Sequence, residues 1–273
     1  MAHPISLATL TVLELAPPDV VSCAAEAGFD LVGIRVLPST PDEVQNVLVG
    51  DTPMVLETER RLKQTGIRCL EIEIFRLKPE TRVADFEGAL ASGARFGATE
   101  ALVADDDPDE ARLTDNFAAF CDLARPYGIS ANLESMPWTH CTSFAQALRV
   151  VTAAGRANSG VLIDAIHFDR GGSRVSEILE APRRLLRYVQ LCDAPAEHPT
   201  DLQGVLFQGR SERLMPGEGG LDLKAILRNL PKDIPLSLEI PMESLARTVP
   251  PVERARRMLN KTRQLLRDLD NQG

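Results

Sequence analysis

The feature that most constrains the fold is an alternation that runs through all 273 residues. Short apolar runs rich in β-forming residues alternate with amphipathic segments, as in repeated βα units built on a parallel sheet. Eight such units follow one another without a Gly/Ser linker or a low-complexity segment between them. A closed (β/α)8 barrel takes ~250 residues. We therefore predict an α/β fold, with a single (β/α)8 TIM barrel as one domain over residues 1–273.

Proline and glycine mark the element boundaries. Pro17 and Pro18 open the first predicted helix and Gly28 closes it. In strand 67–77 the alternation of apolar side chains with Glu71 and Glu73 predicts one wet face. The expected strands are 5–11, 31–37, 67–77, 101–104, 130–134, 160–166, 188–192 and 236–240. The expected helices are 17–28, 52–64, 83–96, 109–125, 143–154, 177–186, 221–230 and 252–268.

The connection at about 193–220 is too long for a plain barrel loop, which predicts a functional role for it. A doubly wound open sheet is the alternative fold. That fold normally carries a glycine-rich phosphate turn after an early strand, and the sequence has none.

Charge and cysteine usage narrow the functional classes. The chain has 30 Lys+Arg against 39 Asp+Glu, a net charge of −9, and no basic run, which argues against a nucleic-acid partner. The apolar stretch 5–15 lacks a basic n-region and is interrupted by Glu14, so it reads as a strand and no membrane partner is expected. Five cysteines without C-x-x-C spacing argue against a disulfide framework and a zinc knuckle. We expect a cytoplasmic protein with a small-molecule substrate.

Four polar side chains close predicted strands: Glu134, Asp164, Gln190 and Glu239. In a barrel these strand ends meet at one rim, where active sites are built. Three carboxylates packed together would repel one another unless a cation lay among them. All-oxygen ligation favours Mn²⁺ or Mg²⁺, and Co²⁺ could substitute; Zn²⁺ usually recruits His or Cys. The alternative for each residue is a solvated carboxylate or a helix cap.

Several stretches carry a family resemblance, at 132–138 (NLESMPW), 160–168 (GVLIDAIHF), 188–195 (YVQLCDAP), 215–219 (MPGEG) and 236–241 (LSLEIP). With these motifs the chain resembles the xylose isomerase-like TIM barrels, a family of sugar phosphate isomerases and epimerases. Members include hydroxypyruvate isomerase, ketose 3-epimerase, inosose dehydratase and 3-dehydroshikimate dehydratase. The resemblance covers the C-terminal half well. The N-terminal half matches mainly in its alternation of strands and helices, with weaker motif matches at 33–35 and 73–76.

The resemblance implies that Glu134, Asp164, Gln190 and Glu239 are the metal ligands. A Gln as third ligand is similar to hydroxypyruvate isomerase-like members, whereas many ketose epimerase-like members have His there. The Asp-x-x-His motif formed by Asp164 and His167 implies that His167 contacts a substrate oxygen.

His140 lies six residues after Glu134, at about the position of a substrate-contacting Glu in ketose epimerase-like relatives. An imidazole there suits proton transfer, and the alternative is a loop histidine. The candidate substrate-binding residues are Arg35, Glu73, Trp138, Glu218 and Arg213. Arg76 and Arg210 are further candidates for binding an anion, and the alternative for the arginines is a salt bridge or a solvated surface.

The resemblance implies a divalent-metal-dependent isomerase or epimerase acting on a sugar-like α-hydroxy ketone or aldehyde. Glu134 and Glu239 are expected to act as an acid/base pair through an enediolate, with His167 and His140 on substrate oxygens. A metal-dependent dehydratase is the alternative, because the same intermediate can expel a β-hydroxyl. A non-catalytic sugar-binding barrel is a remoter alternative. An endonuclease IV-like repair enzyme is disfavoured by only four histidines and the charge of −9. The resemblance also implies a homodimer or homotetramer.

Overall fold

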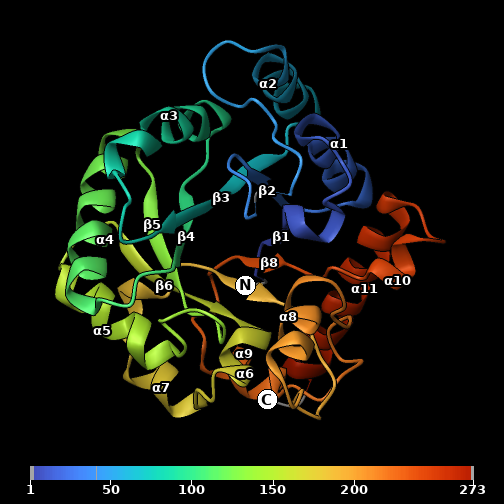
Figure 1. Ribbon diagram of the computed structural model, residues 1–273. Coiled ribbons are helices and arrows are strands. Elements are labelled where there is room, and N and C mark those ends of the chain that lie inside the picture. Colours follow the sequence, from blue (N-terminus) through green and yellow to red (C-terminus); the bar gives the residue numbers. More distant parts are fainter. Residues whose placement is uncertain (1–2, 41, 272–273) are drawn as a thin grey trace.

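The computed structural model describes residues 3–40 and 42–271. Its eight parallel strands close into one barrel in chain order, and helices surround the barrel on the outside (Figure 1). Closure joins β1 to β8, with Ile5 opposite Leu236 and Leu7 opposite Leu238. The predicted fold is therefore confirmed. The strands are β1 (Ile5–Leu7), β2 (Leu31–Arg35), β3 (Arg68–Leu77), β4 (Glu100–Asp105), β5 (Ser130–Glu134), β6 (Ser159–Asp164), β7 (Val189–Leu191) and β8 (Leu236–Leu238).

Capping residues fix where the helices begin and end. Thr52 accepts a hydrogen bond from the Val55 amide to start α2, and Gly28 ends α1 in the left-handed conformation at φ 93°. The α-helices are α1 (Pro17–Ala27), α2 (Pro53–Thr65), α3 (Glu87–Phe96), α4 (Glu110–Ala124), α5 (Phe144–Ala154), α6 (Ala165–Arg170), α7 (Val175–Glu180), α8 (Leu202–Arg210), α9 (Leu223–Asn229), α10 (Glu243–Ala246) and α11 (Pro251–Asp270). Short 3-10 helices are η1 (Thr9–Val12), η2 (Val83–Phe86), η3 (Arg125–Tyr127) and η4 (Arg183–Leu185).

Among the differences from the prediction, two strand ends and one loop show how side chains that bind backbone groups start or end an element. β1 ends at Leu7, not at residue 11, because η1 turns across the barrel end and the Thr11 hydroxyl donates to the Leu238 carbonyl. β6 ends at Asp164, whose carboxylate accepts from the amides of Ile166 and His167 and so starts α6. The predicted loop 193–220 contains α8, which Asp201 caps through the Gly204 amide.

The predicted wet face of β3 is wrong. Glu71 and Glu73 are both fully buried, because in a closed barrel alternate side chains of a strand point into the packed interior. Glu71 accepts a hydrogen bond from the Ser237 hydroxyl. Burial, reinforced by the charge of Glu73, raises the pKa of Glu71 to about 8. Glu71 and Glu73 therefore lie in the packed interior of the barrel, on the same strand as the buried Leu70 and Ile74, and not against water.

The apolar core has two parts. The larger fills the space between the strands and the helices, and all five cysteines are unpaired and buried. The smaller plugs the barrel interior beneath the rim and consists of Leu31, Leu70, Ile74, Leu102, Ala104, Met136, Leu162 and Tyr188, with Trp138 packed against it. This plug makes the rim the floor of a pocket instead of the mouth of a pore. None of the described helices is both long enough and apolar enough to span a membrane.

Candidate active site

The four predicted strand-end residues converge at the carboxyl end of the barrel. Glu134 ends β5, Asp164 ends β6, Gln190 lies in β7 and Glu239 follows β8, and all four are buried. Asp164 and Gln190 are register partners in neighbouring strands, and the Gln190 Nε2 donates to Glu239 Oε1 at 3.1 Å. Their predicted convergence is confirmed, whereas their role as metal ligands stays a prediction.

Arg213 lies among these carboxylates. Its Nη1 is 2.6 Å from Asp164 Oδ2, and its Nη2 is 3.0 Å from Glu239 Oε2. The Nε atom donates to the Gly209 carbonyl at 2.9 Å, and the side chain is only 1% exposed. With Glu134, Asp164 and Glu239 ionised, three negative charges and one guanidinium leave a net charge of −2. A single divalent cation would neutralise this cluster.

The three carboxyl groups differ in their electrostatics. Burial, followed by the charges of Glu239 and Asp164, raises the pKa of Glu134 well above its ordinary value. Burial likewise raises the pKa of Glu239, against the opposing effect of Arg213. Burial also opposes ionisation of Asp164, but Arg213 and His167 outweigh it and lower the pKa of Asp164. Asp164 is therefore the fixed anion of the cluster, while Glu134 and Glu239 favour a proton or a cation.

The donor set fits a divalent metal ion. The Oε1 atoms of Glu134 and Gln190 are buried without a hydrogen-bond partner, which is costly for polar atoms. Ligand atoms of Glu134, Asp164 and His167 lie within 4.8 Å of one another. Burial lowers the pKa of His167 to about 4, so its imidazole is neutral at pH 7 and able to act as a ligand or a hydrogen-bond partner. His167 therefore extends the predicted all-oxygen set by one nitrogen.

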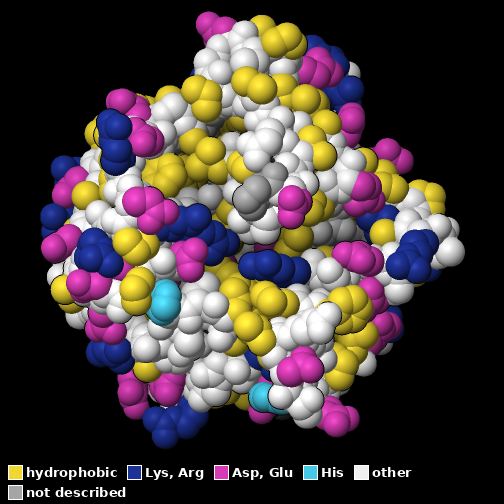
Figure 2. Space-filling view, viewed as in Figure 1, with side chains coloured by type: hydrophobic (Ala, Val, Ile, Leu, Met, Phe, Trp, Pro, Cys, Tyr) yellow, Lys and Arg dark blue, Asp and Glu magenta, His cyan; other side chains and the backbone are white. Residues whose placement is uncertain are grey.

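A pocket of about 430 Å³ opens over this cluster and is lined by Glu134, His167, Arg213 and Glu239. Trp138 forms one wall, with its ring centroid 4.7 Å from that of His167 in an edge-on arrangement. Lys and Arg side chains gather at the middle of the face shown in Figure 2, where the surface is hollowed. The predicted wall residue Trp138 thus lies against the pocket.

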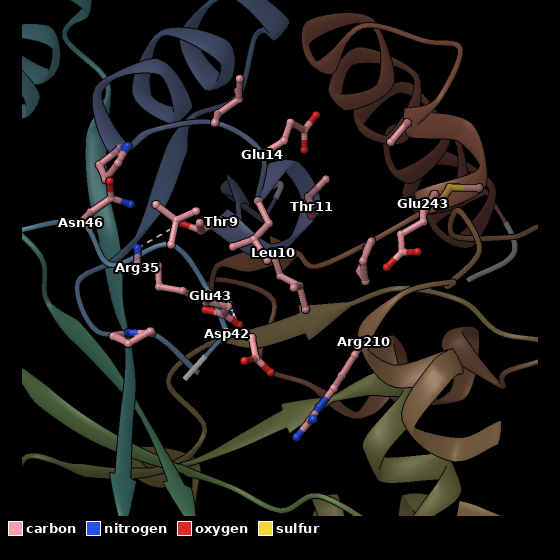
Figure 3. Close-up of a pocket in the computed structure, with 18 of the residues that line it drawn as sticks. Thr9, Leu10, Thr11, Glu14, Arg35, Asp42, Glu43, Asn46, Arg210 and Glu243 are labelled. Carbon is pink, nitrogen blue, oxygen red and sulfur yellow. Dashed lines mark hydrogen bonds and ion pairs between the residues drawn. The ribbon is translucent and has the colours of Figure 1, made fainter. Parts of the chain in front are cut away.

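Arg35 links the pocket to the opposite side of the barrel. Its Nε is 3.2 Å from Glu73 Oε1, and its Nη1 lies 3.0 and 3.1 Å from the two carboxylate oxygens of Glu43. A second pocket of about 660 Å³ shares Arg35, Glu43 and Arg210 with the first (Figure 3). Glu43 was not predicted, because it lies in the irregular segment between β2 and α2 and no motif marks it.

The structure places two predicted site residues elsewhere. His140 is exposed and lines a separate cavity of about 110 Å³ with Asp107 and Cys141, because Asp105 binds the Cys141 amide and draws this loop toward α4. Glu218 pairs with Lys261 Nζ of α11 at 2.8 Å and does not line the pocket. The structure therefore places His140 and Glu218 outside the lining of this pocket, and their predicted roles on the substrate stay predictions.

Asp193 is a residue that the prediction missed. Its carboxylate accepts hydrogen bonds at 2.9 to 3.1 Å from four backbone amides, those of Ala194, Gly217, Gly219 and Leu221. Its backbone pairs with Leu214, next to Arg213. Asp193 therefore fixes the PGEG turn through its carboxylate and the backbone beside Arg213 through its own backbone. The rule that singled out other strand-end acids also applies to Asp193, which lies two residues after the end of β7.

A closed eight-stranded barrel with buried carboxylates at the carboxyl ends of its strands defines a class of barrels with the active site at that rim. The model of the xylose isomerase-like TIM barrel family matches residues 21–265, and the chain belongs to that family. The resemblance seen in the sequence is confirmed, and it extends into the N-terminal half, where the motifs were weak.

Named relatives differ in their reactions. An inosose isomerase of Bacillus velezensis is 24% identical over 215 residues, which cover 74% of each chain. A 3-dehydroshikimate dehydratase of Pseudomonas aeruginosa is 29% identical over 136 residues, 48% of this chain and 21% of that protein. Among solved structures, the IolI protein with a bound zinc atom has a TM-score of 0.77 at 19% identity and covers 97% of both chains.

Proposed function

We propose that the protein is a divalent-metal-dependent isomerase or epimerase of a sugar-like α-hydroxy ketone or aldehyde. The observation that carries the proposal is the pair of buried, unpartnered oxygens, Glu134 Oε1 and Gln190 Oε1, in a cluster of three carboxyl groups and one guanidinium on the floor of a pocket. Burying ionised carboxylates side by side costs free energy through desolvation and repulsion, and a bound divalent cation offsets that cost. The isomerase among the relatives that match three quarters of the chain supports the same reaction class.

Glu134, Asp164, Gln190 and Glu239 would hold the cation, with His167 beside them. When bound, the cation would stabilise negative charge on two adjacent substrate oxygens and so acidify the C–H between them. Mn²⁺ or Mg²⁺ suits the oxygen donors best; Zn²⁺ and Co²⁺ are alternatives, since His167 adds a nitrogen and the similar IolI structure holds zinc.

The acid/base work falls to Glu134 and Glu239. One carboxylate removes the proton from the substrate carbon, giving an enediolate, and the other returns a proton to the adjacent carbon or to the opposite face. His167 Nε2 lies 3.8 Å from Glu134 Oε1, on the pocket side, where it can exchange a hydrogen bond with a substrate oxygen. Trp138 holds the His167 ring edge-on and limits water access from that wall.

Incubation with candidate hydroxy ketones in D₂O tests the reaction class. The protein is loaded in turn with Mn²⁺, Mg²⁺, Co²⁺ and Zn²⁺, and products are followed by NMR and mass spectrometry. We expect one solvent deuterium on carbon in a product with the substrate's molecular formula. Two results would contradict the proposal and favour a sugar-binding barrel. In the first, the protein binds none of the four metals stoichiometrically; in the second, it binds a metal but exchanges no substrate proton.

Glu239→Gln separates chemistry from metal binding, because the amide keeps an oxygen donor and loses the proton-transfer group. We expect metal stoichiometry near that of the wild type and a fall in kcat of about 10²-fold or more. The matched control is Glu218→Gln, which makes the same change at a glutamate paired with Lys261 outside the pocket. Near-wild-type kcat in Glu239→Gln would show that Glu239 is not the acid/base group.

A dehydratase is the second candidate, favoured by the match to the 3-dehydroshikimate dehydratase over 136 residues. In this reaction the proton is removed in the same way, and hydroxide then leaves from the β-carbon with a proton supplied by the second carboxyl group. The D₂O experiment distinguishes the two, since loss of one water from the substrate mass identifies the lyase.

A further inference from the structure

Four arginines line the 430 Å³ pocket, and they fall into two pairs. Arg35 and Arg213 are committed to carboxylates, Arg35 to Glu43 and Glu73 and Arg213 to Asp164 and Glu239. Arg76 and Arg210 line the same pocket, and within residues 3–40 and 42–271 no carboxylate lies within 4.0 Å of either guanidinium. Two positive charges at the mouth therefore lack an ion-pair partner.

The two free arginines come from different parts of the fold. Arg76 is near the carboxyl end of β3 and is half-buried, and its Nη2 donates to the Ser39 hydroxyl at 3.4 Å. Arg210 ends α8 and lines both pockets, as does Asp42 from the segment after β2; Figure 3 labels both among the residues of the 660 Å³ pocket. The charge of Arg76 contributes to lowering the pKa of Arg210, after burial, so the two guanidiniums repel each other across the mouth.

Arg210 is held in place. Its guanidinium carbon lies 5.2 Å from the centroid of Trp138, the single tryptophan of the chain, which itself packs on His167. The neighbouring Gly209 lets the end of α8 approach Trp138 and His167, because a Cβ there would lie 2.6 Å from Trp138 Cη2 and 3.3 Å from His167 Cε1. The guanidinium is thus pre-positioned within the same wall that carries His167.

We propose that Arg76 and Arg210 together bind an anionic group of the substrate, a carboxylate or a phosphate, at the mouth of the 430 Å³ pocket. Bidentate guanidinium contacts suit both groups. This inference rests on the proposed function, which places the reacting carbons over Glu134 and Glu239. It adds that the substrate is a sugar acid or a sugar phosphate, with its charged end toward α8 and β3.

The test measures binding without turnover. The metal-loaded protein is titrated with sorbitol, gluconate and sorbitol 6-phosphate, three polyols of the same carbon-chain length with no carbonyl group to isomerise. Calorimetry gives Kd, and fluorescence of Trp138 reports binding beside Arg210. We expect gluconate, sorbitol 6-phosphate or both to bind about tenfold or more tightly than sorbitol. Which of them does so identifies the group as a carboxylate or a phosphate.

Arg76→Gln and Arg210→Gln should each remove most of that advantage and leave the Kd of sorbitol within about twofold. Arg247→Gln is the matched control, because Arg247 is an exposed arginine that lines the neighbouring 660 Å³ pocket only. It should keep the full advantage. Since an anion can also bind at the metal, an advantage that survives in both pocket variants overturns the proposal.

Equal binding of all three polyols to the wild type also overturns the proposal. Both outcomes are independent of the D₂O experiment, so a protein that binds the anions through these arginines but exchanges no proton would contradict only the proposed function.

Discussion

At the scale of single residues, Arg213 is the clearest case of a role that its position in the sequence does not indicate. It was predicted as a substrate-binding residue on a long loop, and it is a buried cation between two of the proposed metal ligands. A guanidinium in this position replaces part of the charge compensation that a metal ion supplies. It also joins β6 to the segment after β8, because Nη1 contacts both Asp164 Oδ2 and the Glu239 carbonyl.

Replacing Arg213 by Met should destabilise the metal-free protein by about 3 kcal/mol or more, because it leaves buried carboxylates without a counter-charge. Saturating Mn²⁺ should restore part of the loss. Urea unfolding with and without the metal measures both values. Arg187→Met provides the comparison, since Arg187 pairs with Glu100 at the amino ends of the strands. The free energy of unfolding that this variant loses relative to the wild type should be the same with and without metal. An equal metal response in both variants would contradict this prediction.

His167 predicts a pH dependence of stability. Its pKa falls from 6.5 to about 4 on folding, chiefly through burial, so the unfolded chain binds more protons than the native state between these values. Stability from this group is complete above pH 6.5 and is lost as the pH falls toward 4, by up to ~3 kcal/mol. Unfolding free energies of the metal-free protein from pH 7 to 4 should fall more steeply for the wild type than for His167→Asn. Parallel curves would show that His167 is not buried as a neutral imidazole.

At the scale of elements, the segment from β7 to α9 depends on one carboxylate. Beyond the end of β7, the Asp193 carboxylate accepts hydrogen bonds from four backbone amides, one from the next residue and three from the PGEG turn and the residue that follows Gly220. A negative charge that accepts several amide hydrogen bonds is a strong fixing point for a loop. The long connection is therefore ordered at both ends, by Asp193 and by the cap of α8.

Asp193→Ala should cost about 3 kcal/mol of stability, because four amides lose a charged acceptor. Hydrogen exchange should quicken at Gly217, Gly219 and Leu221, and kcat should fall because Arg213 is no longer held. Asp222→Ala, which removes a helix cap with a hydrogen bond to the Ala225 amide, should cost only about 1 kcal/mol and leave exchange in the PGEG turn unchanged. Unaltered exchange in Asp193→Ala would refute the proposed anchoring.

The elements were largely predictable from the sequence, and their ends were not. The periodicity of apolar residues identified all eight strands, and the strand-end rule located Glu134, Asp164, Gln190 and Glu239, because parallel strands in a barrel must end at one rim. The shortened β1 depended on the hydroxyl of Thr11 meeting a carbonyl of β8, over 200 residues away along the chain. Such contacts leave no local pattern.

Side-chain direction in loops was equally hidden. His140 and Glu218 each lie near a site motif in the sequence, yet the Asp105 and Asp193 carboxylates bend their loops so that both side chains point elsewhere. The alternation of polar and apolar residues in β3 predicts a solvent-facing side, because alternation alone does not distinguish solvent from the packed interior of a barrel. Spacing along the chain predicts proximity, and tertiary hydrogen bonds decide orientation.

At the scale of the whole molecule, the barrel and the proposed metal site stabilise each other. The four proposed ligands come from four neighbouring strands, so a bound cation would tie half of the barrel together. Binding to the native state alone adds stability in proportion to the logarithm of the metal concentration over Kd. The site is thus a structural feature as well as a chemical one.

Loading with metal at 100 times Kd should stabilise the protein by about 2.7 kcal/mol. The melting temperature should therefore rise by roughly 5–10 °C, and EDTA should reverse the rise. Asp164→Asn should lose most of the shift, whereas Glu218→Gln should keep it. Calorimetric scans of the three proteins with and without Mn²⁺ make the comparison, and a melting temperature insensitive to every divalent metal would argue against the site.

The pairing of β1 with β8 has a consequence for how the protein is made. A ribosome releases Glu134, Asp164 and Gln190 well before Arg213 and Glu239, and the first strand waits for its neighbour until Leu236 has emerged. Until then the nascent chain carries acids destined for burial without the guanidinium that compensates them. Cation binding at the proposed site can consequently begin only after Glu239 has left the ribosome, because until then the ligand set is incomplete.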